Sequence, residues 1–343
     1  MTGEHGIRRP GRVLTALICA LTAAGLYGCS GTDRREPAPT PTPTSPAPTS
    51  PVPAGHSPFT GLPARTGPVL AVKIDNAAAA RPHTGLGAAD LVYVEQVEGG
   101  ATRIMAVYSS RLPDRVGPVR SARESDIELL AQFDHPALAY SGSQTALKPL
   151  LEAAPLEALP QATAPGAYVR GDTRPAPHNL YLLPARALAA APDAGPAKDI
   201  GFRFGPTPGG GTPVNERTVR YPAARYTFTW SAPDRAWRVA MDGAPARSTD
   251  SGPLKPSTIV IQHVDIRASR FHDFLGSVSP YTVSVGGGTA LVLRDGRAYE
   301  ARWSRPAAAS GTTFTTPTGT PLTFAAGQIW VLLAPENAPG SAP

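Results

Sequence analysis

Cysteine is scarce in this 343-residue sequence, which contains only Cys19 and Cys29. Both lie near the N-terminus, so the rest of the chain has no thiol for a disulfide or for cysteine-ligated zinc. The sequence also lacks the motifs His-Glu-x-x-His, Gly-x-Ser-x-Gly and Ser-x-x-Lys, and the Walker phosphate loop. We therefore expect neither a metal site nor a cofactor, and no standard catalytic centre is identified.

A strong excess of charge is missing too. The formal net charge is +6. Residues 1–28 contain three arginines and one glutamate, a net charge of +2, so about +4 is left for the rest of the chain. This charge is too diffuse for a nucleic-acid-binding protein. A mild positive balance suits an acidic envelope polymer, lipid headgroups or an acidic envelope protein as partner.

The N-terminus has the parts of a signal peptide. Arginines precede the apolar residues 13–26, which are too few for a confident membrane span. The run ends in a sequence that resembles the lipobox of bacterial lipoproteins, in the order Leu26, Tyr27, Gly28 and Cys29. We predict a signal peptide over residues 1–28 and lipidation of Cys29; the alternative is ordinary secretion with cleavage near Ala24. Two or more acyl chains would hold the protein stably at the outer face of the cytoplasmic membrane.

A tether is expected after Cys29. Residues 29–57 are rich in proline and threonine, cannot build a core, and favour an extended polyproline-like chain. At ~3.1 Å per residue such a segment reaches ~90 Å when stretched. It would keep a folded head away from the bilayer.

The head is predicted to have two domains. Residues 58–205 mix expected strands at 69–75 and 137–141 with helices at 144–153 and 184–190, which indicates an α+β or mixed α/β domain. The Gly/Pro-rich stretch at residues 205–213 is predicted to be a linker between the two domains. Residues 214–338 then form a smaller, mostly-β domain.

Short strands separated by turns dominate that second domain. The triple glycine at residues 286–288 lacks the Lys-Ser/Thr of a phosphate loop and is expected to be a flexible turn. The expected strands are at residues 225–230, 236–241, 258–263, 281–285, 290–294, 298–303, 312–315 and 329–333.

The first domain is expected to be organised around a β-hairpin. Apolar runs at residues 91–97 and 104–108 flank Gly99 and Gly100, and paired glycines favour a tight turn. With a two-residue loop, Gln96 lies opposite Arg103 and Glu98 is the diagonal neighbour of Arg103.

A helix is predicted after the hairpin, with Ser121 as N-cap and Glu124 completing a capping box. Arg120 and Arg123 flank this start, where a cation is disfavoured by ~0.3–1 kcal/mol. A bound anion would reverse that penalty. The alternative is an ion network of the two arginines with Glu95, Glu98 or Asp126, and both interpretations remain open.

Several strings of the head resemble the YerB-like lipoprotein family, DUF3048. They are Lys73-Ile74-Asp75-Asn76, Ala80-Arg81-Pro82, Ala89-Asp90, Val97-Glu98-Gly99-Gly100 and residues 116–123 and 176–181, with Asp295-Gly296, Trp303 and residues 326–330 in the second half. The resemblance implies a bacterial, membrane-tethered lipoprotein with separate N- and C-terminal domains, and it supplies no reaction. The chain departs from the family pattern at Val94, where glutamate is usual, and at His83, where glutamine is expected.

One cleft is predicted to collect the remaining polar residues of the first domain. The candidate ligand-binding residues are Asp75, Asn76, Glu98, Arg103, Arg120, Arg123, His178 and Asn179. We expect a ligand- or partner-binding module with an anion-favouring cleft. The alternative is a cell-wall-modifying hydrolase or transferase that uses Asp75, Glu98 and His178 for acid–base chemistry.

Overall fold

A computed structural model describes residues 53–273 and 275–336. The predicted signal peptide, the lipidation site Cys29 and nearly all of the predicted tether lie outside the described residues. Inside them, no helix combines the length and apolar character needed to span a membrane.

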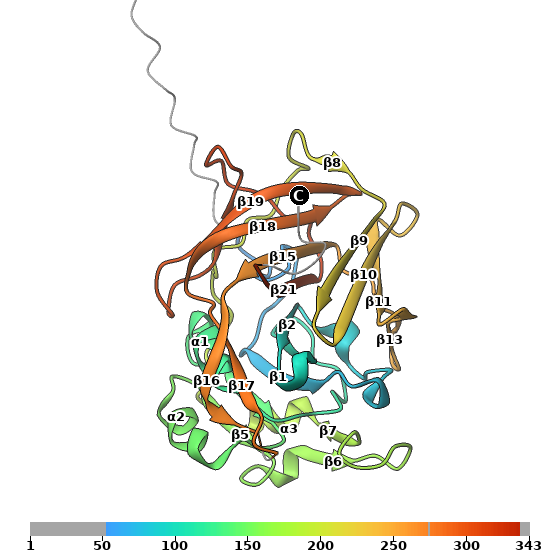
Figure 1. The fold of residues 1–343 in the computed structure, drawn as a ribbon. Helices are drawn as coiled ribbons and strands as arrows, with labels where there is room; N and C mark the ends of the chain where they lie inside the picture. Colours follow the sequence, from blue (N-terminus) through green and yellow to red (C-terminus); the bar gives the residue numbers. More distant parts are fainter. Residues whose placement is uncertain (1–52, 274, 337–343) are drawn as a thin grey trace, which may run out of the picture. The chain divides into compact units, whose positions relative to one another are not determined.

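Within the described residues, eleven strands form one sheet (Figure 1). Their order is β20-β19-β18-β15-β21-β2-β3-β1-β4-β5, and β8 pairs with β19. The bounds are β1 Leu70–Asp75, β2 Leu91–Gln96, β3 Thr102–Tyr108, β4 Ala137–Tyr140, β5 Glu157–Pro160, β8 Thr212–Pro213, β15 Thr258–Val264, β18 Gly286–Arg294, β19 Arg297–Arg305, β20 Thr313–Thr315 and β21 Ile329–Pro335.

Both predicted domains contribute to this sheet. Strand β21, from the C-terminal end of the described residues, lies between β15 and β2 and runs parallel to both. The α+β class agrees with a sheet-rich head that carries short helices. The two predicted regions share one sheet, because β21 of the second half is hydrogen-bonded to β2 in the hairpin of the first. The stretch 205–213 is held against the sheet as well, since Arg297 donates hydrogen bonds to the carbonyl oxygens of Gly210 and Gly211.

Smaller sheets surround the large one. A four-stranded sheet has the order β12-β11-β10-β9, and the remaining pairs are β13-β14, β16-β17 and β6-β7. Their bounds are β9 Glu216–Tyr221, β10 Ala224–Ser231, β11 Ala236–Met241, β12 Ala244–Pro245, β13 Arg247–Ser248, β14 Gly252–Pro253, β16 Ile266–His272, β17 Val278–Thr282, β6 Tyr168–Arg170 and β7 Leu180–Leu182. We call the β16–β17 hairpin, residues 266–282, the arm.

The helices are short. The α-helices are α1 Glu124–Leu130, α2 Lys148–Ala153 and α3 Pro184–Ala189. Single 3-10 turns lie at Ala78–Ala80, Leu86–Ala88, Glu98–Gly100, Ala131–Phe133, Thr145–Leu147 and Pro165–Ala167. The expected helices near residues 144 and 184 are thus confirmed, the first of them beginning with a 3-10 turn.

The central strands β15, β21, β2, β3 and β1 are buried on both faces, so a core forms on each side of the sheet. Tyr226, Phe228 and Trp237 of the four-stranded sheet pack into the core on one face. Leu129 of α1 and Phe271 of the arm pack into the core on the other face. This second face turns polar at one end of β1, β2 and β3, and the site is built there.

The hairpin and the helix start differ from the predicted details. The turn spans Glu98–Gly100, and the backbone N–H of Val97 bonds to the carbonyl of Ala101 at 2.8 Å. This longer loop shifts the register by one residue, so that Arg103 lies opposite Glu95 and Gln96 lies opposite Thr102.

The N-cap of α1 is Arg123 rather than Ser121. The Asp126 carboxylate accepts a hydrogen bond from the backbone N–H of Arg123 at 2.7 Å, which takes the role that we expected for Glu124. The helix has only seven residues. Its N-terminus therefore cannot by itself account for an anion site.

Two predictions in the second half are also wrong. Strand β17 ends at Thr282 rather than spanning residues 281–285. Gly286–Gly288 is the first part of β18 and pairs with β19 instead of forming a turn. A Cβ on Gly288 would lie 2.8 Å from the indole nitrogen of Trp303, so glycine is needed there for close packing.

Candidate functional site

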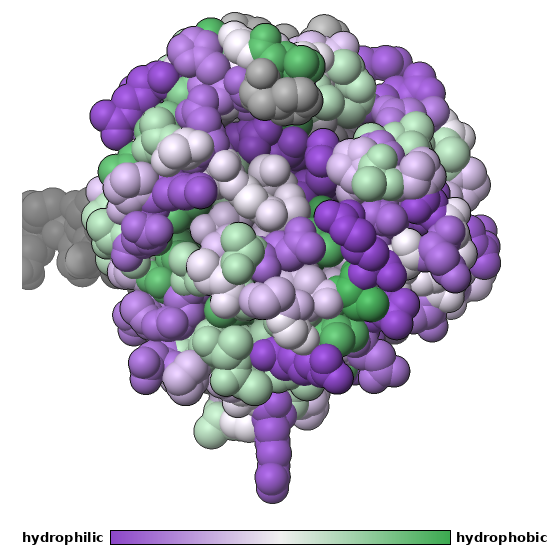
Figure 2. Space-filling view, turned by 90° about the horizontal axis from the view of Figure 1, so that it is seen from below, coloured by the Kyte–Doolittle hydropathy of each residue, from purple (hydrophilic) through white to green (hydrophobic). Residues whose placement is uncertain are grey.

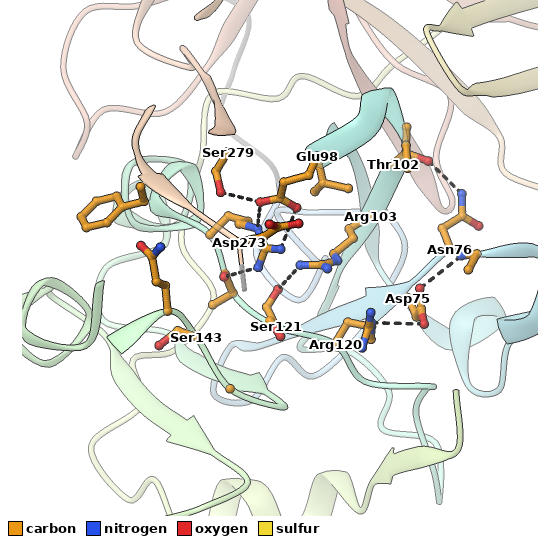
Figure 3. A pocket seen from close by; sticks show the side chains of 18 of the residues that line it. Asp75, Asn76, Glu98, Thr102, Arg103, Arg120, Ser121, Ser143, Asp273 and Ser279 are labelled. Carbon is orange, nitrogen blue, oxygen red and sulfur yellow. Dashed lines mark hydrogen bonds and ion pairs between the residues drawn. The ribbon is translucent and has the colours of Figure 1, made fainter. Parts of the chain in front are cut away.

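A cavity of about 960 Å³ lies at the polar end of β1 and β3. Its walls come from the hairpin turn, residues 120–124, residues 142–147 and the arm. Figure 3 shows Arg103 between Glu98 and Ser279 on one side and Asp75 and Arg120 on the other. Residues of both predicted domains, 58–205 and 214–338, therefore contribute to this cavity.

Strand pairing explains why the floor of the cavity is charged. Alternating side chains of a strand share one face, and the face that holds Tyr93 and Met105 also holds Glu95 and Arg103. Asp75 is the direct neighbour of Arg103 on β1. Three adjacent strands thus place Asp75, Glu95 and Arg103 at the same end of the sheet and on the same face.

Asp75 is held by several groups. Its Oδ2 lies 2.7 Å from Nδ1 of His178 and 3.3 Å from Nε of Arg120. Its Oδ1 accepts a hydrogen bond from the backbone N–H of Ala77 at 3.1 Å. Nε of Arg120 makes no hydrogen bond despite its short distance to Asp75. The Asp75 carboxylate therefore joins the loop of His178 to the wall of the cavity.

Glu98 forms the second ion pair of the cavity. It binds Arg123 in a bidentate manner, with Nε–Oε1 and Nη2–Oε2 distances of 2.6 and 2.7 Å. Ser279 of the arm also donates a hydrogen bond to Oε1. Burial acts to raise the pKa of Glu98, but the hydrogen bonds from Arg123 and Ser279 outweigh it and lower the pKa to about 2. Glu98 is thus ionised at neutral pH and has no proton to give as a general acid.

Arg103 differs from the other three arginines that line the cavity, each of which has an ion-pair partner. Only 8% of it is exposed, and its Nη1 donates to the carbonyl oxygen of Ser121 at 2.9 Å. None of the described carboxylates lies within 4.0 Å of its guanidinium as an ion-pair partner. Burial and the charges of Arg123 and Arg120 lower the pKa of Arg103 to about 10. A buried cation beside two others is costly unless an anion joins it.

A separate charged cluster lies buried under the cavity. Nζ of Lys73 is 2.5 Å from Oδ1 of Asp126 and 3.0 Å from Oε2 of Glu95. All three side chains are at most 1% exposed. Burial raises the pKa of Glu95 to about 7, although the charge of Lys73 acts against this. We call Lys73, Glu95 and Asp126 the buried cluster.

The structure brings six of the eight candidate residues to the cavity, namely Asp75, Asn76, Glu98, Arg103, Arg120 and Arg123. His178 does not line it and reaches it only through Asp75. Asn179 lies elsewhere, because its amide bonds to Arg170 and to the carbonyl of Gly171. The predicted convergence on one cleft is therefore wrong for Asn179.

Asn76 has a structural environment. Its amide nitrogen donates to Thr102 at 2.9 Å and to Tyr226 at 2.5 Å, and its oxygen accepts from Nε of Arg81 at 3.0 Å. These bonds connect β1 to the four-stranded sheet. Little of its hydrogen-bonding capacity is left for a ligand.

His83 is another buried polar residue at this end of β1. Its Nε2 donates to the backbone carbonyl of Asp75 at 2.8 Å. Burial lowers the pKa of His83 to about 4, so the ring is neutral at physiological pH. This departure from the family pattern therefore supports the backbone of Asp75 rather than facing a ligand.

Two family models match the chain. The one described as "Protein of unknown function (DUF3048) N-terminal domain" covers residues 59–197, and the DUF3048 C-terminal domain covers residues 217–331. The chain belongs to the DUF3048 family. The family resemblance in the sequence is thereby confirmed, and each matched region contributes to the large sheet and to the cavity.

Similar proteins point to the same family. "Putative lipoprotein YerB" of Bacillus subtilis (strain 168) is 36% identical over 113 residues, which is 33% of this chain and 34% of the relative. The matched segment thus spans about a third of that relative's length. The crystal structure of the Bacillus subtilis YerB protein aligns with a TM-score of 0.71 over 82% of this chain and 96% of that chain. At 23% identity this likeness shows a shared fold.

Sequence reasoning missed Lys73 and the arm. Lys73 interrupts an otherwise apolar strand, and a lysine there signals a buried partner of opposite charge. Ser279 carried no such signal, because its contact with Glu98 joins residues 181 positions apart. Nowhere between residues 53 and 336, position 274 aside, do three His, Cys, Asp or Glu residues form a group that could hold a metal ion.

Proposed function

We propose that this protein is an extracytoplasmic lipoprotein whose head binds an anionic ligand in the cavity at Arg103. The observation that supports this most is the buried guanidinium of Arg103, which faces the cavity without a carboxylate partner among the described residues. Phosphate and carboxylate oxygens match its planar set of donors.

The neighbours of Arg103 favour an anion as well. Arg120 and Arg123 lie close enough to lower the pKa of Arg103, while Asp75 and Glu98 are already engaged in ion pairs. The other carboxylates of the cavity have hydrogen bonds or ion pairs of their own: Glu124 with Ser269, Asp273 with two backbone N–H groups and Asp242 with Arg81. An incoming anion would therefore complete the charge balance at Arg103.

The enzymatic alternative receives less support. General acid catalysis needs a carboxyl group that keeps a proton near neutral pH. Glu98 is bound by Arg123 with a pKa of about 2, and Asp75 is bound by Arg120 and His178. Both carboxylates therefore form ion pairs in the wall of the cavity, and neither is arranged as a general acid.

Binding of inorganic phosphate tests the proposal. Calorimetric titration of the detergent-solubilised full chain at low ionic strength should show saturable binding, and Arg103→Gln should weaken it by roughly ten- to a hundredfold, which corresponds to ~1.5–3 kcal/mol for a hydrogen bond to a charged group. Arg111→Gln is the matched control, because Arg111 is exposed and lies away from the cavity. Equal binding by the Arg103 variant and the wild type would contradict the proposal.

The lipid anchor is tested separately. Cys29→Ala should abolish incorporation of labelled fatty acid and move the protein from the membrane fraction to the medium, because the acyl chains provide the membrane affinity. Ser30→Ala is the control and should leave both readouts unchanged. A Cys29 variant that is still labelled would show that the anchor assignment is wrong.

A further inference from the structure

The cavity at Arg103 continues along the arm. A second cavity of about 510 Å³ lies between the arm and residues 144–150 and shares Gln144, Phe271 and His272 with the first. The two cavities meet where the side-chain amide of Gln144 donates to the carbonyl oxygen of His272. We call the two adjoining cavities together the groove.

The second cavity has a cation of its own. Arg270 is exposed and lines it, and the described residues include no carboxylate that pairs with Arg270. Its guanidinium carbon lies 5.0 Å from the centroid of the Phe271 ring, a distance at which a cation–π contact orients the side chain. The groove thus has a guanidinium without a carboxylate partner in each of its two parts.

Gln144 lines both the cavity of Arg103 and the cavity of Arg270. Its Oε1 is buried and has no hydrogen-bond partner. A buried acceptor of this kind is expected to be satisfied, and a donor from a bound molecule would satisfy it. A hydroxyl or an amide N–H between two anionic groups of a ligand fits this position.

We propose that the groove binds a linear polyanion, a flexible chain that carries phosphate or carboxylate groups at intervals. One anionic group is bound at Arg103 and another at Arg270, with a hydrogen-bond donor of the chain at Gln144. This inference rests on the proposed anion binding at Arg103 and adds the second subsite and the polymeric nature of the ligand.

Chain length is the variable that tests it. We would titrate the full chain with orthophosphate and with inorganic polyphosphate of increasing length, and compare affinities per phosphate group to remove the statistical advantage of long chains. Occupation of two linked subsites should raise the affinity per group by roughly tenfold or more once the chain spans both.

Variants separate the two subsites. Arg270→Gln should remove the gain with length and leave orthophosphate binding unchanged, whereas Arg103→Gln should weaken both. Arg267→Gln is the matched control, because Arg267 is also an exposed arginine of the arm stacked on a ring, that of Tyr281, but lines a different cavity. The control should keep the gain with length.

The outcomes are distinguishable. Orthophosphate binding at Arg103 without any gain with length would overturn the polymer inference and leave the proposed function intact. An equal loss in the Arg267 and Arg270 variants would overturn it too, because diffuse charge on the arm would then explain the gain. The same titration with poly-L-glutamate identifies the source: preference for polyphosphate assigns a phosphate polymer, and preference for polyglutamate assigns a carboxylate polymer.

Discussion

The buried cluster and the cleft arginines, Arg103, Arg120 and Arg123, lie at the same end of the large sheet and balance charge in opposite ways. Lys73 faces two carboxylates at 2.5 and 3.0 Å. The three cleft arginines share the carboxylates of Asp75 and Glu98, and Arg103 has neither as a partner within 4.0 Å. Carboxylates outnumber the cation in the buried cluster, whereas the three cleft arginines outnumber the two carboxylates that pair with them.

The difference separates residues that hold the fold from residues available for binding. In the buried cluster Oδ2 of Asp126 also accepts from the backbone N–H of Arg123, so the cluster fixes the start of α1. The guanidinium of Arg123 then projects from that helix start towards Glu98. The interior pairs therefore position the cleft, and the predictions below test the two regions against each other.

The largest expected effect is on stability, in the buried cluster. Lys73→Met leaves Glu95 and Asp126 without their cation, which should lower the free energy of unfolding by ~3–5 kcal/mol. Chemical denaturation of the full chain measures this. Lys148→Met at an exposed position should change stability by at most ~0.5 kcal/mol. A Lys73 variant as stable as the wild type would show that the cluster does not hold the sheet and helix together.

Next comes the pH dependence of stability. The pKa of Glu95 is raised to about 7, so its contribution to stability is present below about pH 4.5 and is lost as the pH rises through 7. His83 has the opposite effect on stability. Its pKa is lowered to about 4, so between about pH 4 and 6.5 the unfolded chain binds more protons than the folded chain, and stability rises with pH. Only a comparison with a variant isolates Glu95.

Glu95→Gln should therefore gain stability relative to the wild type between pH 5 and 8, by on the order of 1–3 kcal/mol. Denaturation curves at several pH values measure the difference. The control Glu152→Gln, at an exposed site, should show the same dependence of stability on pH as the wild type. A constant difference between the Glu95 variant and the wild type would mean that Glu95 does not titrate in this range.

A smaller effect is expected from removing a carboxylate of the cleft. Glu98→Gln frees Arg123 and removes one negative charge from the cavity, so orthophosphate affinity should rise by roughly three- to tenfold, or ~0.7–1.4 kcal/mol. Competition titration against the wild type measures it, with Glu152→Gln again as control. Weaker binding would indicate that Glu98 itself contacts the ligand or orders the site.

Local patterns predicted much of this molecule. Local patterns account for the buried strand that begins at Leu70, the hairpin around Gly99 and the polar residues of the cleft wall at the strand ends. The family strings identified the family. Of the two interpretations of Arg120 and Arg123, the ion network is present for Arg123, which pairs with Glu98, whereas Arg120 pairs with Asp75, which was not among the expected partners.

Long-range pairing limited the rest. Nothing near residues 329–335 indicates that this strand enters beside β2, more than two hundred residues earlier. The register at Arg103 depended on one extra residue in the turn. Arm residues such as Ser279 meet the cleft only after the whole sheet has formed, so no local pattern could place them there.

The central claim is that the guanidinium of Arg103 forms an anion site. A crystal soaked in selenate would test this claim most directly. Selenate is a tetrahedral oxyanion whose selenium atom is located by its anomalous scattering. We predict a peak in the main cavity with selenate oxygens within ~3 Å of the Arg103 guanidinium, absent from crystals of the Arg103→Gln variant. A cavity without selenate at Arg103, with peaks only at exposed arginines, would contradict the account.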